Sequence, residues 1–171
     1  MKLAIQFGLF TGIASSLWMY LKYAYSISNA AFGGVAAYLP YLILFLGIGA
    51  GIYFRRHSVE FGPGFLSFKE GARAGVVISL IAGLTLATYA MVHFLAVHPG
   101  YLQEASDSLR AAMEKDNKDA TEIEQAIAQM KSAKSVGKLM FGSFTVTLII
   151  GMVGSFIIAA LLKKESVSSE E

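Results

Sequence analysis

Four long stretches of the chain carry no formally charged side chain and are mostly apolar; they cover residues 3–21, 23–54, 74–97 and 139–162. A hydrocarbon core of about 30 Å needs roughly 20 helical residues to cross it, and each stretch meets that length. Backbone N–H and C=O groups cannot stay unpaired in lipid, so each stretch must be helical. The pattern predicts an all-α membrane protein with four transmembrane helices packed as a bundle.

The first two spans each have an alternative interpretation. The apolar stretch 3–21 competes with a cleaved signal peptide, but it is longer than the usual apolar region of about 7–15 residues. We therefore expect it to be retained as a span. The second stretch contains Pro40, which is tolerated in the first turns of a helix or at a kink. A start between residues 31 and 36 puts Pro40 near the beginning, and we place this span at 33–54.

The third helix is expected to begin before the membrane. Gly62-Pro63-Gly64 is typical of a turn, and Ser67 and Glu70 have the spacing of a capping box. The aromatic and basic residues between 65 and 73 are typical of a segment in the headgroup region. The sequence predicts one helix over 68–97, about 45 Å long, of which 74–97 crosses the membrane.

Residues 99–138 form the sizeable polar region between the last two spans. Apolar residues recur there at helical spacing in two groups, first Leu102, Ala105, Leu109, Ala112 and Met113, and then Ile123, Ala126, Ile127, Met130 and Ala133. Residues 115–120 separate the groups, and Thr121 with Glu124 has a second capping-box spacing. We predict a short amphipathic helical hairpin. It either binds a partner or the membrane surface, or it is a connector packed on the bundle's own end, which we favour.

The composition of the chain excludes several kinds of functional site. The chain has 171 residues, is 55% apolar and 15% charged, and contains no cysteine. Soluble domains carry roughly 25% charged residues, so much of this surface does not face water. The lack of cysteine excludes disulfides, thiolate metal ligands and a cysteine nucleophile. A net charge of +2 is too small to indicate a nucleic-acid partner. All 26 charged residues lie outside the four spans.

Basic residues next to the span ends predict the orientation. Arg55-Arg56, Lys69 with Arg73, and Lys163-Lys164 adjoin spans on the side that holds both termini. On the opposite side Arg110, Lys115 and Lys118 lie far from the spans, although Lys131, Lys134 and Lys138 approach the last one. The positive-inside rule therefore favours cytoplasmic termini. The tail 163–171 is polar and short.

Small residues at intervals of four mark the faces through which these helices are expected to pack. Such residues let two helix backbones approach closely. The set comprises Gly8, Gly12 and Ser16 in the first span, Gly47 and Gly51 in the second, Gly71 and Gly75 at the start of the third helix, and Thr147, Gly151 and Ser155 in the fourth. We assign them to packing within one chain, with homodimerisation as the alternative.

Residues suited to catalysis or ion coupling are scarce. No Asp, Glu, Lys or Arg lies in any span, although buried charges usually mark transport pathways. His93 and His98 lie five apart and near Glu104, but an interfacial histidine is commoner than a metal ligand. Gly47-Ile48-Gly49-Ala50-Gly51 lies within an apolar span, without the strand and turn of a nucleotide loop. We expect no catalytic residue, no metal site and no cofactor.

The order of segments resembles a known family. The chain opens with MKLAIQFGLFTGIASSLWMYL, continues through FGPGFLSFKEGARAG and HPGYLQEASDSLRAAMEKD, and its final span ends in AALLKK. The most specific parts are Gly64-Phe65-Leu66-Ser67-Phe68 and Tyr101-Leu102. This resembles the bacterial family of four-span membrane proteins called domain of unknown function 4199, over essentially the whole chain. The resemblance implies the bacterial inner membrane and supplies no activity or catalytic residue.

Two hypotheses of function follow. The first is a non-enzymatic accessory or structural membrane protein, a single integral domain over 1–171 whose partners are the lipid bilayer and a membrane protein or second copy. The second is a homo-oligomeric transporter or channel subunit for a small solute or ion. A transporter would have to use the hydroxyls of Thr11, Ser15, Ser16 and Thr147 together with the glycines at the helix entries, because no charge is available in the spans. A polar cavity between the helices would favour the second hypothesis, and a dry glycine-packed interior the first.

Overall fold

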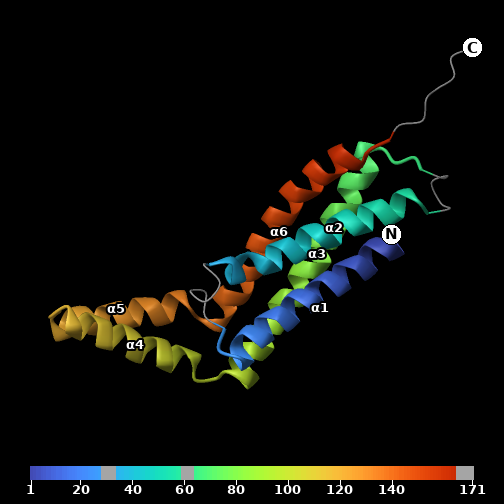
Figure 1. Cartoon of the computed structure of the whole chain (residues 1–171). Helices are drawn as coiled ribbons and strands as arrows, with labels where there is room; N and C mark the ends of the chain where they lie inside the picture. The colour runs from blue at the N-terminus through green and yellow to red at the C-terminus, as the bar shows by residue number, and fades with distance from the viewer. Residues whose placement is uncertain (28–33, 59–63, 165–171) are drawn as a thin grey trace, which may run out of the picture. The chain divides into compact units, whose positions relative to one another are not determined.

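The computed structural model describes residues 1–27, 34–58 and 64–164. In these ranges the order of helices is α1 (Lys2–Ala24), α2 (Val35–Arg56), α3 (Phe68–Val92), the π-helix η3 (His93–Val97), α4 (Tyr101–Lys115), α5 (Ala120–Ala133) and α6 (Val136–Leu162) (Figure 1). Four of them, counting α3 and η3 together, are long and apolar enough to cross a membrane. The predicted all-helical fold with four spans is confirmed. The turn residues Gly62 and Pro63, residue 33 of the second span and the tail beyond 164 lie outside the described residues.

The single domain expected from the sequence contains two compact units. The first unit comprises Met1–Leu86 and Phe144–Glu171, and the second comprises Ala87–Ser143. The first unit therefore holds α1, α2, most of α3 and most of α6. The second unit holds η3, α4 and α5. Both α3 and α6 pass from one unit into the other.

The helix α1 buries its small residues and exposes its large ones. Its buried positions are Ala4, Gly8, Thr11, Gly12, Ser15 and Ser16, which share one helical face. Phe10 and Leu17 on other faces are 70% and 54% exposed. A helix in a water-soluble protein buries its large apolar side chains instead. The reversed arrangement is typical of a helix whose outer face meets lipid and whose inner face packs closely.

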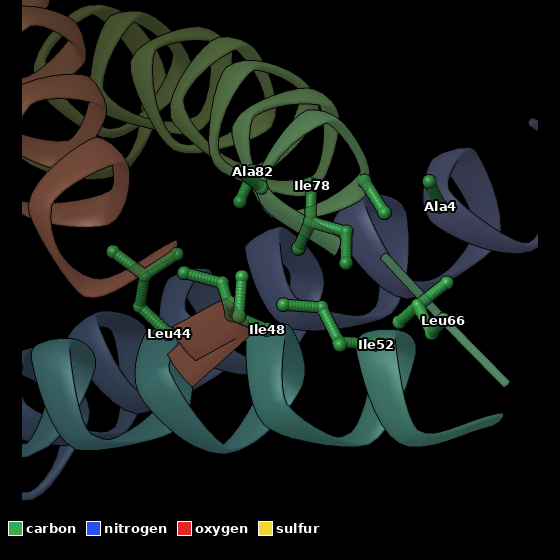
Figure 2. Close-up of a cluster of buried hydrophobic side chains, with 10 residues drawn as sticks. Ala4, Leu44, Ile48, Ile52, Leu66, Ile78 and Ala82 are labelled. Atoms are coloured by element: carbon green, nitrogen blue, oxygen red, sulfur yellow. The ribbon is translucent and has the colours of Figure 1, made fainter. Parts of the chain in front are cut away.

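Larger side chains fill the space where α2 and α3 meet. Leu44, Ile48 and Ile52 on α2 and Ile78 on α3 are at most 2% exposed. Figure 2 shows them in a cluster with Ala4, Leu66 and Ala82. The three α2 residues lie four apart, so a single face of α2 is directed into the core. Leu46 on another face is 64% exposed.

The ends of α1 and α2 show how the chain breaks between the first two spans. Ser26 has a positive φ of 49°, Ser26 N donates to Tyr23 O at 3.1 Å, and Ile27 N donates to Lys22 O at 2.9 Å. These two bonds form a Schellman motif that ends α1. Helix α2 begins at Val35, after Gly34 with φ of 84°. This start lies inside the predicted window, and Pro40 is the sixth residue of the helix.

The third long helix begins and ends where the sequence predicts, but its last turn is wound differently. Ser67 N and Oγ donate to Glu70 Oε2 at 3.1 and 2.8 Å, and Glu70 N donates to Ser67 Oγ at 3.3 Å, so this capping box is confirmed. The single helix predicted over 68–97 is confirmed in its bounds, and its last five residues are wound as the π-helix η3. His98 N donates to His93 O at 2.7 Å across the wider turn. Pro99 disfavours α conformation at His98, so the helix ends at Val97.

Helices α4 and α5 contact each other within the second unit. Asn117 has φ of 55°, and Lys118 N donates to Met113 O at 3.0 Å, which ends α4. The capping box predicted at Thr121 and Glu124 is wrong. Asp119 is the N-cap of α5 and has extended backbone, so Thr121 already lies in the first turn. A capping box needs its Ser or Thr at the non-helical N-cap position.

Candidate functional site

The small residues of α3 and α6 interlock in an antiparallel register. A Cβ added at Gly75 would overlap the side chain of Ser155, and one added at Gly151 would overlap the side chain of Ser79. One turn away, a Cβ at Gly71 would lie 3.1 Å from Cβ of Ala159. Each glycine therefore accepts a small side chain from the opposite helix. The two backbones approach closely because neither helix carries bulk at these positions.

The two serines in this register are fully buried and hydrogen-bonded within their own helices. Ser79 and Ser155 are both 0% exposed. Ser79 Oγ donates to Gly75 O at 2.8 Å, and Ser155 Oγ donates to Gly151 O at 2.6 Å. An unpaired buried hydroxyl would be costly, and here each hydroxyl has an acceptor one turn away. These serines therefore supply small volume to the interface with their donor groups already used.

The glycines of α1 and α2 lie against neighbouring helices in the same way. Gly8 and Gly12 on α1 face Ile81 and Thr85 on α3. Gly47 on α2 faces the side chain of Thr11 on α1, whose Oγ1 donates to Phe7 O at 2.6 Å. Larger residues at these glycines would separate α1 from both neighbours.

The other predicted packing residues also lie in the first unit. Gly51 on α2 faces Ile78 and Phe7. Ser16 is buried, and its Oγ donates to Gly12 O at 2.8 Å. Thr147 on α6 is 7% exposed. All ten positions chosen from the sequence are thus inside the first unit, on four helices.

Sequence reasoning missed Ser79, Gly83 and Gly154. Gly83 faces Phe144, and Gly154 faces the ring of Phe45. Gly71, Gly75, Ser79 and Gly83 continue one interval of four along α3. That continuation was visible in the sequence and could have identified Ser79 and Gly83. The partner of Gly154 is a phenylalanine ring, which no pattern of small residues predicts.

One arginine ties together the end of the first unit where α2 and α6 finish. Arg56 Nε donates to Gly64 O at 3.0 Å, and its Nη1 donates to Leu162 O at 3.4 Å. Beside it Leu66 and Lys164 exchange two backbone hydrogen bonds of 3.0 Å each. The sequence indicated Arg56 only as an orientation charge. In the structure it also binds the oxygen of Leu162, which the end of α6 leaves without a helical donor.

The two histidines considered as metal ligands lie close together in the second unit, but each contacts a partner of its own. His98 Nε2 lies 3.0 Å from Glu104 Oε2, while His93 Nδ1 lies 3.1 Å from the hydroxyl of Tyr89. The two imidazole centroids are 6.1 Å apart. In the part of the chain that the structure describes, no three His, Cys, Asp or Glu side chains gather as metal ligands. Aromatic contacts and hydrogen bonds thus connect the end of α3, η3 and the start of α4.

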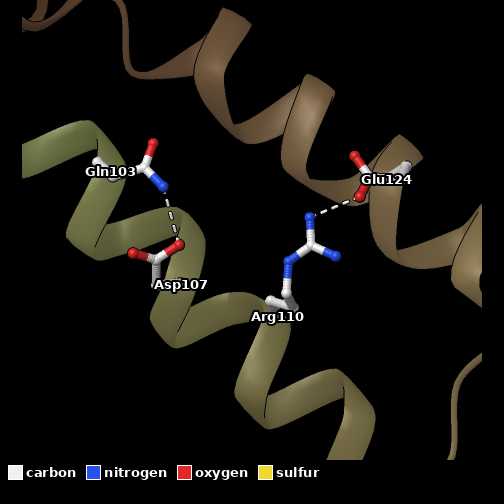
Figure 3. A network of polar contacts seen from close by, with 4 residues as sticks. All are labelled: Gln103, Asp107, Arg110 and Glu124. Carbon is white, nitrogen blue, oxygen red and sulfur yellow. Dashed lines mark hydrogen bonds and ion pairs between the residues drawn. The ribbon is translucent and has the colours of Figure 1, made fainter.

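Two side-chain contacts on α4 and α5 are exposed. Arg110 Nη2 donates to Glu124 Oε1 at 2.5 Å, and Gln103 Nε2 donates to Asp107 Oδ1 at 3.0 Å (Figure 3). The hydrogen bond to Glu124, together with the charge of that carboxylate, raises the pKa of Arg110 above its usual value. Both partners stay accessible to water, so this ion pair adds little to stability.

These features define the class of the protein. Four long apolar helices expose large side chains such as Phe10 and Leu46 and pack through small ones, which makes the chain a multi-pass α-helical membrane protein. More particularly, the chain belongs to the family described as "Protein of unknown function (DUF4199)", whose pattern matches residues 6–164. The family expected from the sequence is therefore confirmed. No curated protein and no solved structure matches the chain.

Proposed function

We propose that this chain is a non-enzymatic accessory or structural protein of the bacterial inner membrane. Its four spans form one bundle, and α4 and α5 form a hairpin outside the membrane. The observation that carries the proposal is the reciprocal fit of Ser79 on Gly151 and Ser155 on Gly75. Interlocked backbones of this kind make a rigid scaffold, and their polar groups are already hydrogen-bonded.

The hydrogen bonds of two hydroxyls on α1 weigh against a polar pathway through one copy of the chain. Thr11 and Ser16, which carry two of the four hydroxyls that a transporter would have to use, donate to carbonyl oxygens of their own helix. Groups held in this way do not offer their protons to a passing solute. We therefore place the homo-oligomeric transporter or channel second. A flux assay in proteoliposomes that shows specific transport of an ion or small solute would reverse this order.

The proposed orientation places both termini in the cytoplasm. Its support is the position of Arg55, Arg56, Lys69, Arg73, Lys163 and Lys164 beside the span ends, as the positive-inside rule requires. A C-terminal alkaline phosphatase fusion should be inactive in bacterial cells, whereas a C-terminal fluorescent fusion should be bright. The reverse pair of results would overturn the orientation.

A membrane-protein partner is proposed to bind the exposed surface of the hairpin. A photo-crosslinking amino acid at Gln125, which is exposed on α5, should give a discrete protein adduct in native membranes. The matched control is the same amino acid at Phe10, which is 70% exposed on α1 and is proposed to face lipid. Mass spectrometry of the adduct identifies the partner or a second copy. Adducts of equal yield at both positions, or at neither, would contradict an accessory role.

A further inference from the structure

An open groove lies on the outer surface of the first unit, along the start of α3. It has a volume of about 520 Å³ and is lined by Phe68, Lys69, Ala72, Arg73, Val76, Val77 and Phe156. The rings of Phe68 and Phe156 stack with centroids 6.3 Å apart, which joins α3 to α6 at this place. Ala72 contributes only a methyl group beside them. Apart from its two cations, the wall of the groove is hydrocarbon.

The two cations stand together on one side of α3. Lys69 and Arg73 are four residues apart, so their side chains project from the same helical face, and both are exposed. Within residues 1–27, 34–58 and 64–164 neither forms an ion pair. The acid between them, Glu70, is bound by the backbone and hydroxyl of Ser67. The groove therefore presents two positive charges.

The position of the groove along α3 matches the boundary between lipid headgroups and hydrocarbon. Arg73 is the last charged residue before a run without charge that extends through residue 97. The cations thus lie at the headgroup level, and Val76 and Val77 continue the groove toward the hydrocarbon. This order, positive charge and then apolar wall, is complementary to an anionic headgroup followed by acyl chains.

We propose that this groove is a binding site for an anionic phospholipid. Arg73 and Lys69 bind the phosphate, the arginine through its planar set of N–H donors and the lysine as a compact charge. One acyl chain lies along Ala72, Val76 and Val77, beside the two stacked phenylalanine rings. A zwitterionic lipid fills the same groove but lacks the net negative charge that the two cations select. The site goes beyond the accessory role, since it concerns the lipid that surrounds the protein.

The test is native mass spectrometry of the full chain in detergent, titrated with phosphatidylglycerol or with phosphatidylcholine of identical acyl chains. The wild type should bind phosphatidylglycerol at least about tenfold more tightly. Each basic residue near an anionic surface contributes about fivefold, so K69Q/R73Q should weaken phosphatidylglycerol binding roughly 25-fold and abolish the preference. K163Q/K164Q removes two charges at the same end of the unit without touching the groove, and it should keep the preference.

Two further measurements separate this site from general attraction to negative charge. V76F fills the groove and leaves both cations in place, so it should weaken the binding of phosphatidylglycerol. Inorganic phosphate should not displace the lipid, because it lacks the chains that occupy the groove. On the wild type alone, raising the ammonium acetate concentration should reduce the preference, which tests the charge contribution without any variant.

Equal binding of the two lipids by the wild type would overturn the proposal. So would wild-type affinity in K69Q/R73Q or in V76F, an equal loss in K163Q/K164Q, or displacement of the lipid by phosphate alone. Circular dichroism melting in the same detergent checks that each variant is folded.

Discussion

The indole Nε1 of Trp18 on α1 donates a hydrogen bond to the backbone oxygen of Ala36 on α2 at 3.0 Å. Ala36 lies four residues before Pro40, so its oxygen is the one whose helical donor the proline removes. Trp18 therefore replaces the missing N–H with a donor from the neighbouring span. Its contact with Ala36 also explains how Pro40 is accommodated in the sixth position of α2.

This relationship predicts coupling between Trp18 and Pro40. Trp18→Phe keeps an aromatic ring but leaves the Ala36 oxygen without a donor, and it should destabilise the protein by roughly 0.6–2 kcal/mol, as for hydrogen bonds between spans. Pro40→Ala restores the helical N–H. In the Pro40→Ala background the cost of Trp18→Phe should therefore shrink. Unfolding in mixed micelles, followed by circular dichroism, measures all four members of the cycle. Equal costs in both backgrounds would show that the two residues are independent.

Gly151→Ala should destabilise the protein because its new Cβ overlaps the side chain of Ser79. Overpacking of this kind costs about 1–3 kcal/mol. Gly49→Ala is the matched control within a span, because a Cβ at Gly49 meets open space. That control should be neutral or stabilising by up to about 1 kcal/mol, since alanine favours the helix. The same unfolding measurement compares the two variants.

The double variant Ser79→Gly/Gly151→Ala tests the mechanism of that loss. Removing the Ser79 side chain opens space for the new methyl group, so the two substitutions should be less harmful together than the sum of their separate costs. Additive costs would mean that Gly151→Ala acts through something other than its contact with Ser79.

Arg56→Gln should loosen the end of the first unit without unfolding the spans. Arg56 binds the oxygens of Gly64 and Leu162, next to the paired backbones of Leu66 and Lys164. Without the guanidinium, local opening becomes easier, so the amides of Leu66 and Lys164 should exchange with deuterium faster than in the wild type. Lys2→Gln, a charge change in the first turn of α1, serves as the control. Faster exchange along all four spans would indicate global destabilisation instead.

The features predicted correctly from the sequence are those that depend on a short local pattern. Charge-free length located the four spans, and Ser67 with Glu70 located the start of α3, because both signals act over a few residues. The features that the sequence mispredicted or did not reveal have two different causes. Thr121 carried the right spacing, but Asp119, two residues earlier, took the N-cap position. The roles of Trp18 and Arg56 depend on carbonyl oxygens of distant segments, and no pattern within one helix reports which segments become neighbours.

Ile127→Ala should destabilise the packing of α5 far more than removal of the exposed ion pair between Arg110 and Glu124 does. Ile127 and Ile123 lie one turn apart on α5 and are 5% and 4% exposed, whereas Glu124 is accessible to water in its pair with Arg110. Replacing a buried isoleucine with alanine costs about 2–5 kcal/mol, and an exposed ion pair contributes little. Hydrogen exchange of the α5 amides should accelerate at least about 30-fold in Ile127→Ala if α5 opens as a local unit. Glu124→Gln should change it little. A larger acceleration from Glu124→Gln than from Ile127→Ala would mean that charge pairing, and not the buried isoleucine face, holds α5 in place.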